Sequence, residues 1–168
     1  SMCMASASPT VWPKPGSSFE KSGRGKDNKG KAAVMKGKVT TMFQWGYIGM
    51  GTKLAADGKT INVTKCGGVR FWHKGDGKKY RVKLVSSHPD FKQGDGDNHL
   101  GVEFETSGEW QLFDMPVYAF VKEPYWGSFV EPDDALSMVK EIQWQTREQP
   151  HQSIELMIDG VEIYGCEK

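Results

Sequence analysis

Hydrophobic and polar residues alternate in short runs along most of the chain, and turns containing Gly or Pro separate the runs. In the segment 68–73, Val69, Phe71 and His73 fall on one face, whereas Arg70 and Trp72 fall on the other. Similar stretches, alternating or rich in β-branched and aromatic residues, are 39–45, 80–85, 100–106, 110–115, 142–146 and 153–164. Because a two-residue period places alternate side chains on opposite faces, these stretches predict β-strands.

A helical pattern is confined to 132–140, where Asp133 and Asp134 would favour the N-terminal end of a short helix. Many short strands with little helix predict an all-β fold, namely an antiparallel two-sheet β-sandwich of the jelly-roll type. Residues 1–32 are rich in Ser, Pro, Gly and Lys and predict an irregular segment that begins with a tag remnant. The sandwich domain is expected over residues 33–168.

Composition narrows the classes of partner. A chain of 168 residues can form one domain with a sizeable core, and its net charge of +1 argues against nucleic acid or an anionic membrane as partner. No apolar run approaches the roughly 20 residues that a membrane helix needs. The stretch 21–38 carries six lysines and one arginine, but no aromatic residue is interleaved with them, which favours a solvated loop.

The three cysteines, Cys3, Cys66 and Cys166, lie far apart, so the sequence offers no close-spaced metal pair. In an oxidising compartment Cys66 and Cys166 could form a disulfide. The alternative is that both are small buried hydrophobic residues.

The sequence lacks the motifs of the common catalytic sites, including a GxSxG nucleophile turn and a phosphate-binding glycine loop. Glu103 and Glu105 are the acids that can be placed together, about 7 Å apart on one strand. Because both would lie on the same side of a sugar rather than across it, we expect no glycosidase activity. The chain is predicted not to be an enzyme.

Several aromatic residues stand next to turns or on outward strand positions. Trp45 and Tyr47 flank Gly46, Trp72 points away from Phe71, and Tyr125 and Trp126 follow a proline in a loop; the core is the alternative location for each. Exposed aromatic faces stack against the C–H face of a pyranose ring. The polar side chains expected to bind its hydroxyl groups are Asp95, Asp97, His99, Gln143 and Gln145.

Five segments carry a resemblance: WGYIGMGTKL (45–54), GVRFWHKGDGKKYRVKL (68–84), GDGDNH (94–99), GEWQLFDMPVYAF (108–120) and SIELMIDGVEI (153–163). In their order and spacing the chain resembles the family 11 carbohydrate-binding modules, which are calcium-containing jelly-roll domains of secreted bacterial glucanases. The segment 68–82 is also similar to the complex I intermediate-associated family, which shares the galactose-binding-like sandwich.

The resemblance to the glucan-binding modules implies a site on a concave sheet face. It places Tyr47 at a stacking tyrosine, Asp95 or Asp97 at a cleft acid, and His99 at a cleft-side histidine. Trp126, with Tyr125 before it, stands where that family has Asp-Tyr. Gln143 stands where it has a histidine.

The chain departs from that family at three positions, where Thr146 replaces a stacking tyrosine, Lys140 a cleft acid and Glu123 an arginine. Arg70 or Arg147 could substitute for that arginine. The resemblance also implies structural Ca²⁺ at Asp159, with Glu20 as a further ligand, since calcium takes six to eight oxygen ligands.

The resulting prediction is a non-catalytic carbohydrate-binding module that recognises a β-glucan or cellulose chain. Such a module would be a monomer secreted by a bacterium, and it would target a glycoside hydrolase, such as a catalytic domain in the same full-length chain, to its substrate. The alternative is a protein-interaction or assembly domain of the complex I intermediate-associated type, which predicts an exposed apolar patch and a stable protein partner.

Overall fold

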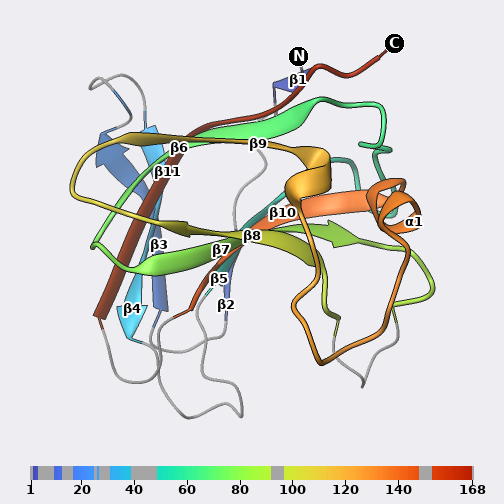
Figure 1. Cartoon of the computed structure of the whole chain (residues 1–168). Coiled ribbons are helices and arrows are strands. Elements are labelled where there is room, and N and C mark those ends of the chain that lie inside the picture. Colours follow the sequence, from blue (N-terminus) through green and yellow to red (C-terminus); the bar gives the residue numbers. More distant parts are fainter. Residues whose placement is uncertain are drawn as a thin grey trace.

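The computed structural model describes residues 2–3, 10–12, 17–24, 26, 31–38, 49–91, 97–147 and 153–167. Its strands form two antiparallel sheets that pack face to face as a sandwich (Figure 1). The predicted all-β fold is thereby confirmed.

Sheet A has the strand order β3-β4-β11-β6-β9, and β1 also pairs with β11; sheet B has the order β2-β5-β10-β7-β8. The strands are β1 (Met2–Cys3), β2 (Thr10–Trp12), β3 (Ser17–Arg24), β4 (Lys31–Lys38), β5 (Gly49–Lys53), β6 (Gly68–Gly75), β7 (Lys79–Ser86), β8 (Leu100–Glu105), β9 (Gln111–Pro116), β10 (Val139–Thr146) and β11 (Ser153–Tyr164). A 3₁₀ turn, η2 (Val117–Ala119), and a short helix, α1 (Pro132–Leu136), connect β9 to β10.

The core lies between the inner faces of the two sheets. Phe71 of β6 stacks on Phe113 of β9, with ring centroids 4.5 Å apart, and meets Phe104 of β8 edge-on. Trp144 of β10 approaches Phe71 from the opposite sheet, also edge-on, at 5.5 Å. The period-two pattern of each strand therefore sends its apolar side chains into one shared interior.

The N-terminal part of the chain differs from the prediction of an irregular segment. Strands β1, β2 and β3 and the start of β4 all lie within residues 1–32, and the expected domain boundary at residue 33 falls inside β4. The sequence of β3, SSFEKSGR, lacks alternation, and its strand conformation comes from pairing with β4, where Phe19 lies opposite Met35. The helix expected over 132–140 is shorter, because β10 begins at Val139. The predicted strand 39–45 lies outside the described residues.

Cys66 and Cys166 are joined by a disulfide, which settles the alternative that the sequence left open. Two backbone hydrogen bonds flank it, from Gly67 N to Tyr164 O at 2.8 Å and from Glu167 N to Lys65 O at 3.0 Å. The end of β11 is therefore fastened to the loop before β6. In the part of the chain that the structure describes, no helix has the length and apolar character needed to cross a membrane.

Candidate binding site on sheet B

The outer face of sheet B carries a row of polar side chains, which we call the polar face: Arg81, Lys83, Glu141, Gln143 and Gln145. The register of β10 with β7 sets Gln143 beside Lys83 and Gln145 beside Arg81. Alternation explains the row, because Ile142 and Trp144, between these residues, point into the core and are almost fully buried.

Two glycines let these side chains lie flat on the sheet. Gly51 of β5 pairs with Gln143, and a Cβ atom at this position would collide with the Glu141 carboxylate. At Gly101 of β8, a Cβ atom would lie 2.7 Å from Nε of Arg81. Larger residues at these positions would displace Glu141 and Arg81, so the glycines shape the polar face.

Lys83 lies at the centre of the polar face and is only partly exposed. Burial, and then the nearby Arg81 guanidinium, lower the pKa of Lys83 to about 8, although Glu123, Glu141 and Asp97 act in the opposite direction. The Lys83 ammonium forms no hydrogen bond or ion pair within the described part of the chain. It is a donor that a ligand oxygen atom could satisfy.

His99 borders the polar face as a neutral side chain. Its Nδ1 atom accepts a hydrogen bond from the backbone N–H of Ser86 at 3.2 Å, and its ring packs on Phe91 at 4.5 Å. Burial lowers the pKa of His99 to about 4, and the positive charges of Lys83 and Lys140 add to the effect. At neutral pH His99 is therefore uncharged.

A chain of polar contacts connects the edge of sheet B to the loop between β9 and β10. Arg147, directly after β10, donates from Nε to Glu103 at 3.2 Å and forms an ion pair with Glu123. The other carboxylate oxygen of Glu123 accepts a hydrogen bond from Trp126 Nε1 at 3.2 Å. These contacts fix Trp126 beside sheet B. Arg147, one of the two arginines suggested as a substitute, lies at this loop, and its role in binding stays a prediction.

Asn98, which is almost completely buried, holds the same loop. Its Nδ2 atom donates to the carbonyl oxygens of Glu123 at 2.7 Å and Trp126 at 2.9 Å, and its Oδ1 atom accepts from Glu123 N at 2.9 Å. Tyr125, which lies between Glu123 and Trp126 in the sequence, is fully exposed. Its φ of 72° is a left-handed conformation that non-glycine residues rarely adopt. The loop is held in one conformation with an aromatic side chain at its tip.

Half of the residues predicted from the sequence come together here. Gln143 and Gln145 belong to the polar face, and His99, Asp97 and Trp126 border it. Three others, Trp45, Tyr47 and Asp95, lie outside the described residues. Tyr125 is on the loop tip described above.

Trp72 and Arg70 do not share this face. Both belong to β6 in sheet A, where Lys26 Nζ lies 3.8 Å from the centre of the Trp72 ring and Arg70 donates to Glu162 at 2.7 Å. Alternation correctly indicates that Trp72 points outward, but the strand order places it on the opposite side of the sandwich from Gln143.

The suggested calcium ligands, Asp159 and Glu20, are both in sheet A. The Asp159 carboxylate accepts hydrogen bonds from Lys26 N and Gly160 N, each at 2.8 Å, and the side chain of Glu20 lies outside the described residues. Among the residues that the structure describes, no three His, Cys, Asp or Glu side chains gather as a metal site. The calcium site stays a prediction.

Three residues of the candidate site, Lys83, Arg81 and Asn98, were not predicted to belong to it. Arg81 and Lys83 fall on one face of the alternating segment 80–85, opposite Val82 and Leu84, but nothing in that pattern indicates that Arg81 is buried and donates to Val121 O at 2.7 Å. Asn98 stands in a polar loop, and its contacts lie 25 and 28 residues away along the chain. Such non-local contacts leave no local signal.

Solved structures that this chain resembles include carbohydrate-binding modules. A family 11 module of a Clostridium thermocellum cellulosomal cellulase has a TM-score of 0.62 and 16% identity, with 96% of this chain and 85% of that chain covered. The family 11 module from the same organism in complex with a β-1,3-1,4-mixed-linked tetrasaccharide gives 0.61 and 18%, with 96% and 86% covered. A family 30 module of another cellulosomal cellulase of this organism gives 0.61 and 11%, with 88% and 81% covered. At these identities the similarity establishes the fold.

Family membership comes from the sequence. No curated protein matches the chain. The family model described as complex I intermediate-associated protein 30 (CIA30) matches residues 16–158, which include strands β3 to β10 and the first half of β11. The chain belongs to the complex I intermediate-associated protein 30 family.

Proposed function

We propose that this chain is a non-catalytic protein-interaction domain that associates with intermediates of complex I assembly. The family match over most of the chain supports this function. Glu103, one of the two acids considered for catalysis, fits a structural role, since it forms ion pairs with both Arg147 and Lys79. The description of the family supplies the class of partner.

The segment between β9 and α1, residues 117–131, exposes several apolar side chains, and this observation carries the proposal. We call this segment the aromatic loop. Exposed large hydrophobic side chains in this region are Tyr118, Val121, Tyr125, Trp126 and Phe129. Several exposed large apolar side chains on one connecting segment of a folded domain are typical of a protein interface. Because Asn98 already fixes the loop, docking a partner would cost little conformational entropy.

Affinity purification of the tagged chain from cells of its own source, followed by mass spectrometry, tests this function. We expect enrichment of complex I subunits, and at least a tenfold loss in the variant Tyr125→Ser/Phe129→Ser. The matched control is Leu112→Ser/Met115→Ser, which removes two exposed apolar side chains from β9. Failure of the wild-type chain to enrich complex I subunits would refute the proposal.

A second candidate function is glycan binding on the polar face, favoured by the unpartnered side chains there. The side chains of Lys83, Gln143 and Gln145 make no hydrogen bond within the described part of the chain, and amide and ammonium groups suit sugar hydroxyls. A similar fold binds a mixed-linked β-glucan tetrasaccharide. A sugar on this face would lie beside Trp126, which is half-exposed.

Affinity gel electrophoresis over a panel of polysaccharides that includes β-1,3-1,4-glucan separates the two candidates. If the polar face binds glycan, a polysaccharide will retard the wild-type chain, and Gln143→Ala, Lys83→Ala and Trp126→Ala will each restore its mobility. Retardation by no polysaccharide rules out the second candidate and leaves the first untouched.

A further inference from the structure

Two of the exposed aromatic residues lie where the aromatic loop meets α1, beside three acids, and we call this region the acidic–aromatic surface: Tyr118, Phe129, Glu131, Asp133 and Asp134. Tyr118 is 54% exposed and Phe129 66% exposed. The hydroxyl of Tyr118 donates to Asp133 Oδ1 at 2.6 Å, so η2 and α1 are in direct contact. The surface thus combines exposed rings with carboxylates.

Three of the five residues of this surface are acidic. Glu131, Asp133 and Asp134 are all exposed, and none of them forms an ion pair within the part of the chain that the structure describes. Residues 129–134 contain these three acids and no basic residue. The carboxylates are therefore free to attract positive charge from outside the chain.

The Phe129 ring lies close to a positive charge of this chain. Lys122 Nζ lies 5.8 Å from the centre of this ring, within the distance at which an ammonium interacts with an aromatic face. A cation of this chain thus already approaches one exposed ring of the surface. An arginine or lysine of a partner could use the exposed part of that ring in the same way.

Taken with the proposed function, on which this inference rests, the geometry points to one class of occupant. We propose that the acidic–aromatic surface docks a basic segment of the protein partner, rich in Arg or Lys and interspersed with apolar side chains. Guanidinium groups would pair with Asp133 and Asp134, and apolar side chains would pack on Tyr118 and Phe129. Such an interface weakens with salt, because exposed charge pairs are screened.

The first test uses two labelled synthetic peptides with the same leucines and aromatic residues, one with arginine and one with glutamate at the remaining positions. Fluorescence anisotropy at low salt should show the arginine peptide binding the wild-type chain at least tenfold more tightly. The variant Glu131→Gln/Asp133→Asn/Asp134→Asn should bind it about tenfold more weakly. The matched control, Glu105→Gln/Glu109→Gln/Glu167→Gln, removes the same charge from exposed positions elsewhere.

Equal loss in both triple variants would show that net charge alone attracts the peptide, and would overturn the proposal. So would equal binding of the two peptides. A photo-crosslinking residue at position 129 then tests the native assembly, where the attached partner peptide should contain several Arg or Lys residues.

The outcomes separate the two proposals. If the chain enriches complex I subunits but the cross-linked peptide is neutral or acidic, this inference fails and the proposed function stands. A cross-link to residues 21–38 of a second copy, the chain's own basic stretch, also overturns it. Absence of complex I subunits refutes the function itself.

Discussion

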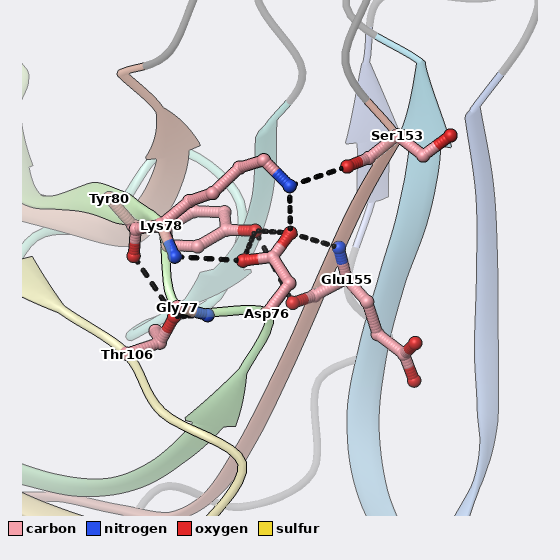
Figure 2. A network of polar contacts seen from close by, with 7 residues as sticks. All are labelled: Asp76, Gly77, Lys78, Tyr80, Thr106, Ser153 and Glu155. Atoms are coloured by element: carbon pink, nitrogen blue, oxygen red, sulfur yellow. Dashed lines mark hydrogen bonds and ion pairs between the residues drawn. The ribbon is translucent and has the colours of Figure 1, made fainter.

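The hydroxyl of Tyr80 donates a hydrogen bond of 3.0 Å to the carboxylate of Asp76, although the Tyr80 ring is fully buried in the core. Asp76 lies in the turn that carries the chain from β6 in sheet A to β7 in sheet B. Figure 2 shows that the same carboxylate also accepts hydrogen bonds from the backbone N–H groups of Lys78 and Glu155. One turn residue therefore connects the core, the turn and β11.

Replacing this carboxylate should destabilise the sandwich and alter its response to acid. Burial alone would raise the pKa of Asp76, but the hydrogen bonds from Glu155, Lys78 and Tyr80 together lower it below its ordinary value. A lowered folded-state pKa contributes stability above the unfolded pKa of about 3.9, and that stability is lost as pH falls through the folded value. We expect Asp76→Asn to cost about 1–3 kcal/mol at pH 7.

Urea unfolding at pH 7 and at pH 3 checks this expectation, with Tyr80→Phe as the partial control. Tyr80→Phe removes one of the hydrogen bonds to Asp76 and should cost about 1 kcal/mol. The loss in Asp76→Asn should shrink towards pH 3, where the wild-type carboxylate begins to protonate. A loss that is equal at both pH values would contradict the role of the charge.

The Cys66–Cys166 disulfide should make the stability of the chain sensitive to reductant. It closes a loop of 100 residues, for which the chain-entropy model gives up to about 4.7 kcal/mol, and native disulfides typically contribute about 2–4 kcal/mol. Reduction should lower the urea midpoint accordingly. The double variant Cys66→Ser/Cys166→Ser should match the reduced protein and show no further response, and an unchanged midpoint on reduction would count against the linkage.

His99 should remain neutral well below the usual range of histidine. Its folded-state pKa of about 4 lies under the unfolded value of about 6.5, so the unfolded chain binds more protons between these values. Stability should therefore fall as pH decreases from about 6.5 to about 4. NMR titration of the His99 ring gives the pKa directly, and a value near 6.5 would show that the site is more solvated than the structure indicates.

The Asn98 contacts should control the order of the aromatic loop. Asn98→Ala removes the acceptor of the Glu123 N–H and both donors to the loop carbonyls, so we expect the Glu123 amide to exchange its hydrogen at least tenfold faster. Hydrogen exchange by NMR measures this rate. Amides of β6, on the other sheet, serve as the internal control, and acceleration there as well would indicate global destabilisation instead.

The sequence predicted strands wherever apolar residues alternate, as in β6, because each such strand buries one face by its own pattern. It did not predict β3, whose conformation depends on pairing with β4. Alternation likewise indicated that Gln143 and Gln145 point outward. The face to which an outward residue such as Trp72 belongs depends on strand order, and a strand's own pattern does not encode that order.

The candidate site was predicted only in part, because part of it depends on contacts that the sequence pattern does not encode. Residue type and position indicated Gln143, His99 and Trp126. The burial of Arg81 and the hold of Asn98 on the loop arise from contacts between segments that are distant along the chain. No sequence pattern marks the exposed carboxylates of α1 as part of a surface. The hydrogen bond from Tyr118 to Asp133 places them beside an exposed aromatic ring.

Two-dimensional electrophoresis, native and then denaturing, of lysates from cells of the chain's own source would show whether the chain resides in complex I assembly intermediates. We predict that the wild-type chain migrates with complex I subunits in assemblies smaller than the mature complex, and that Tyr125→Ser/Phe129→Ser shifts it to the position of the free chain. Migration of the wild-type chain only at the free position would contradict the claim that it is an interaction domain of complex I assembly.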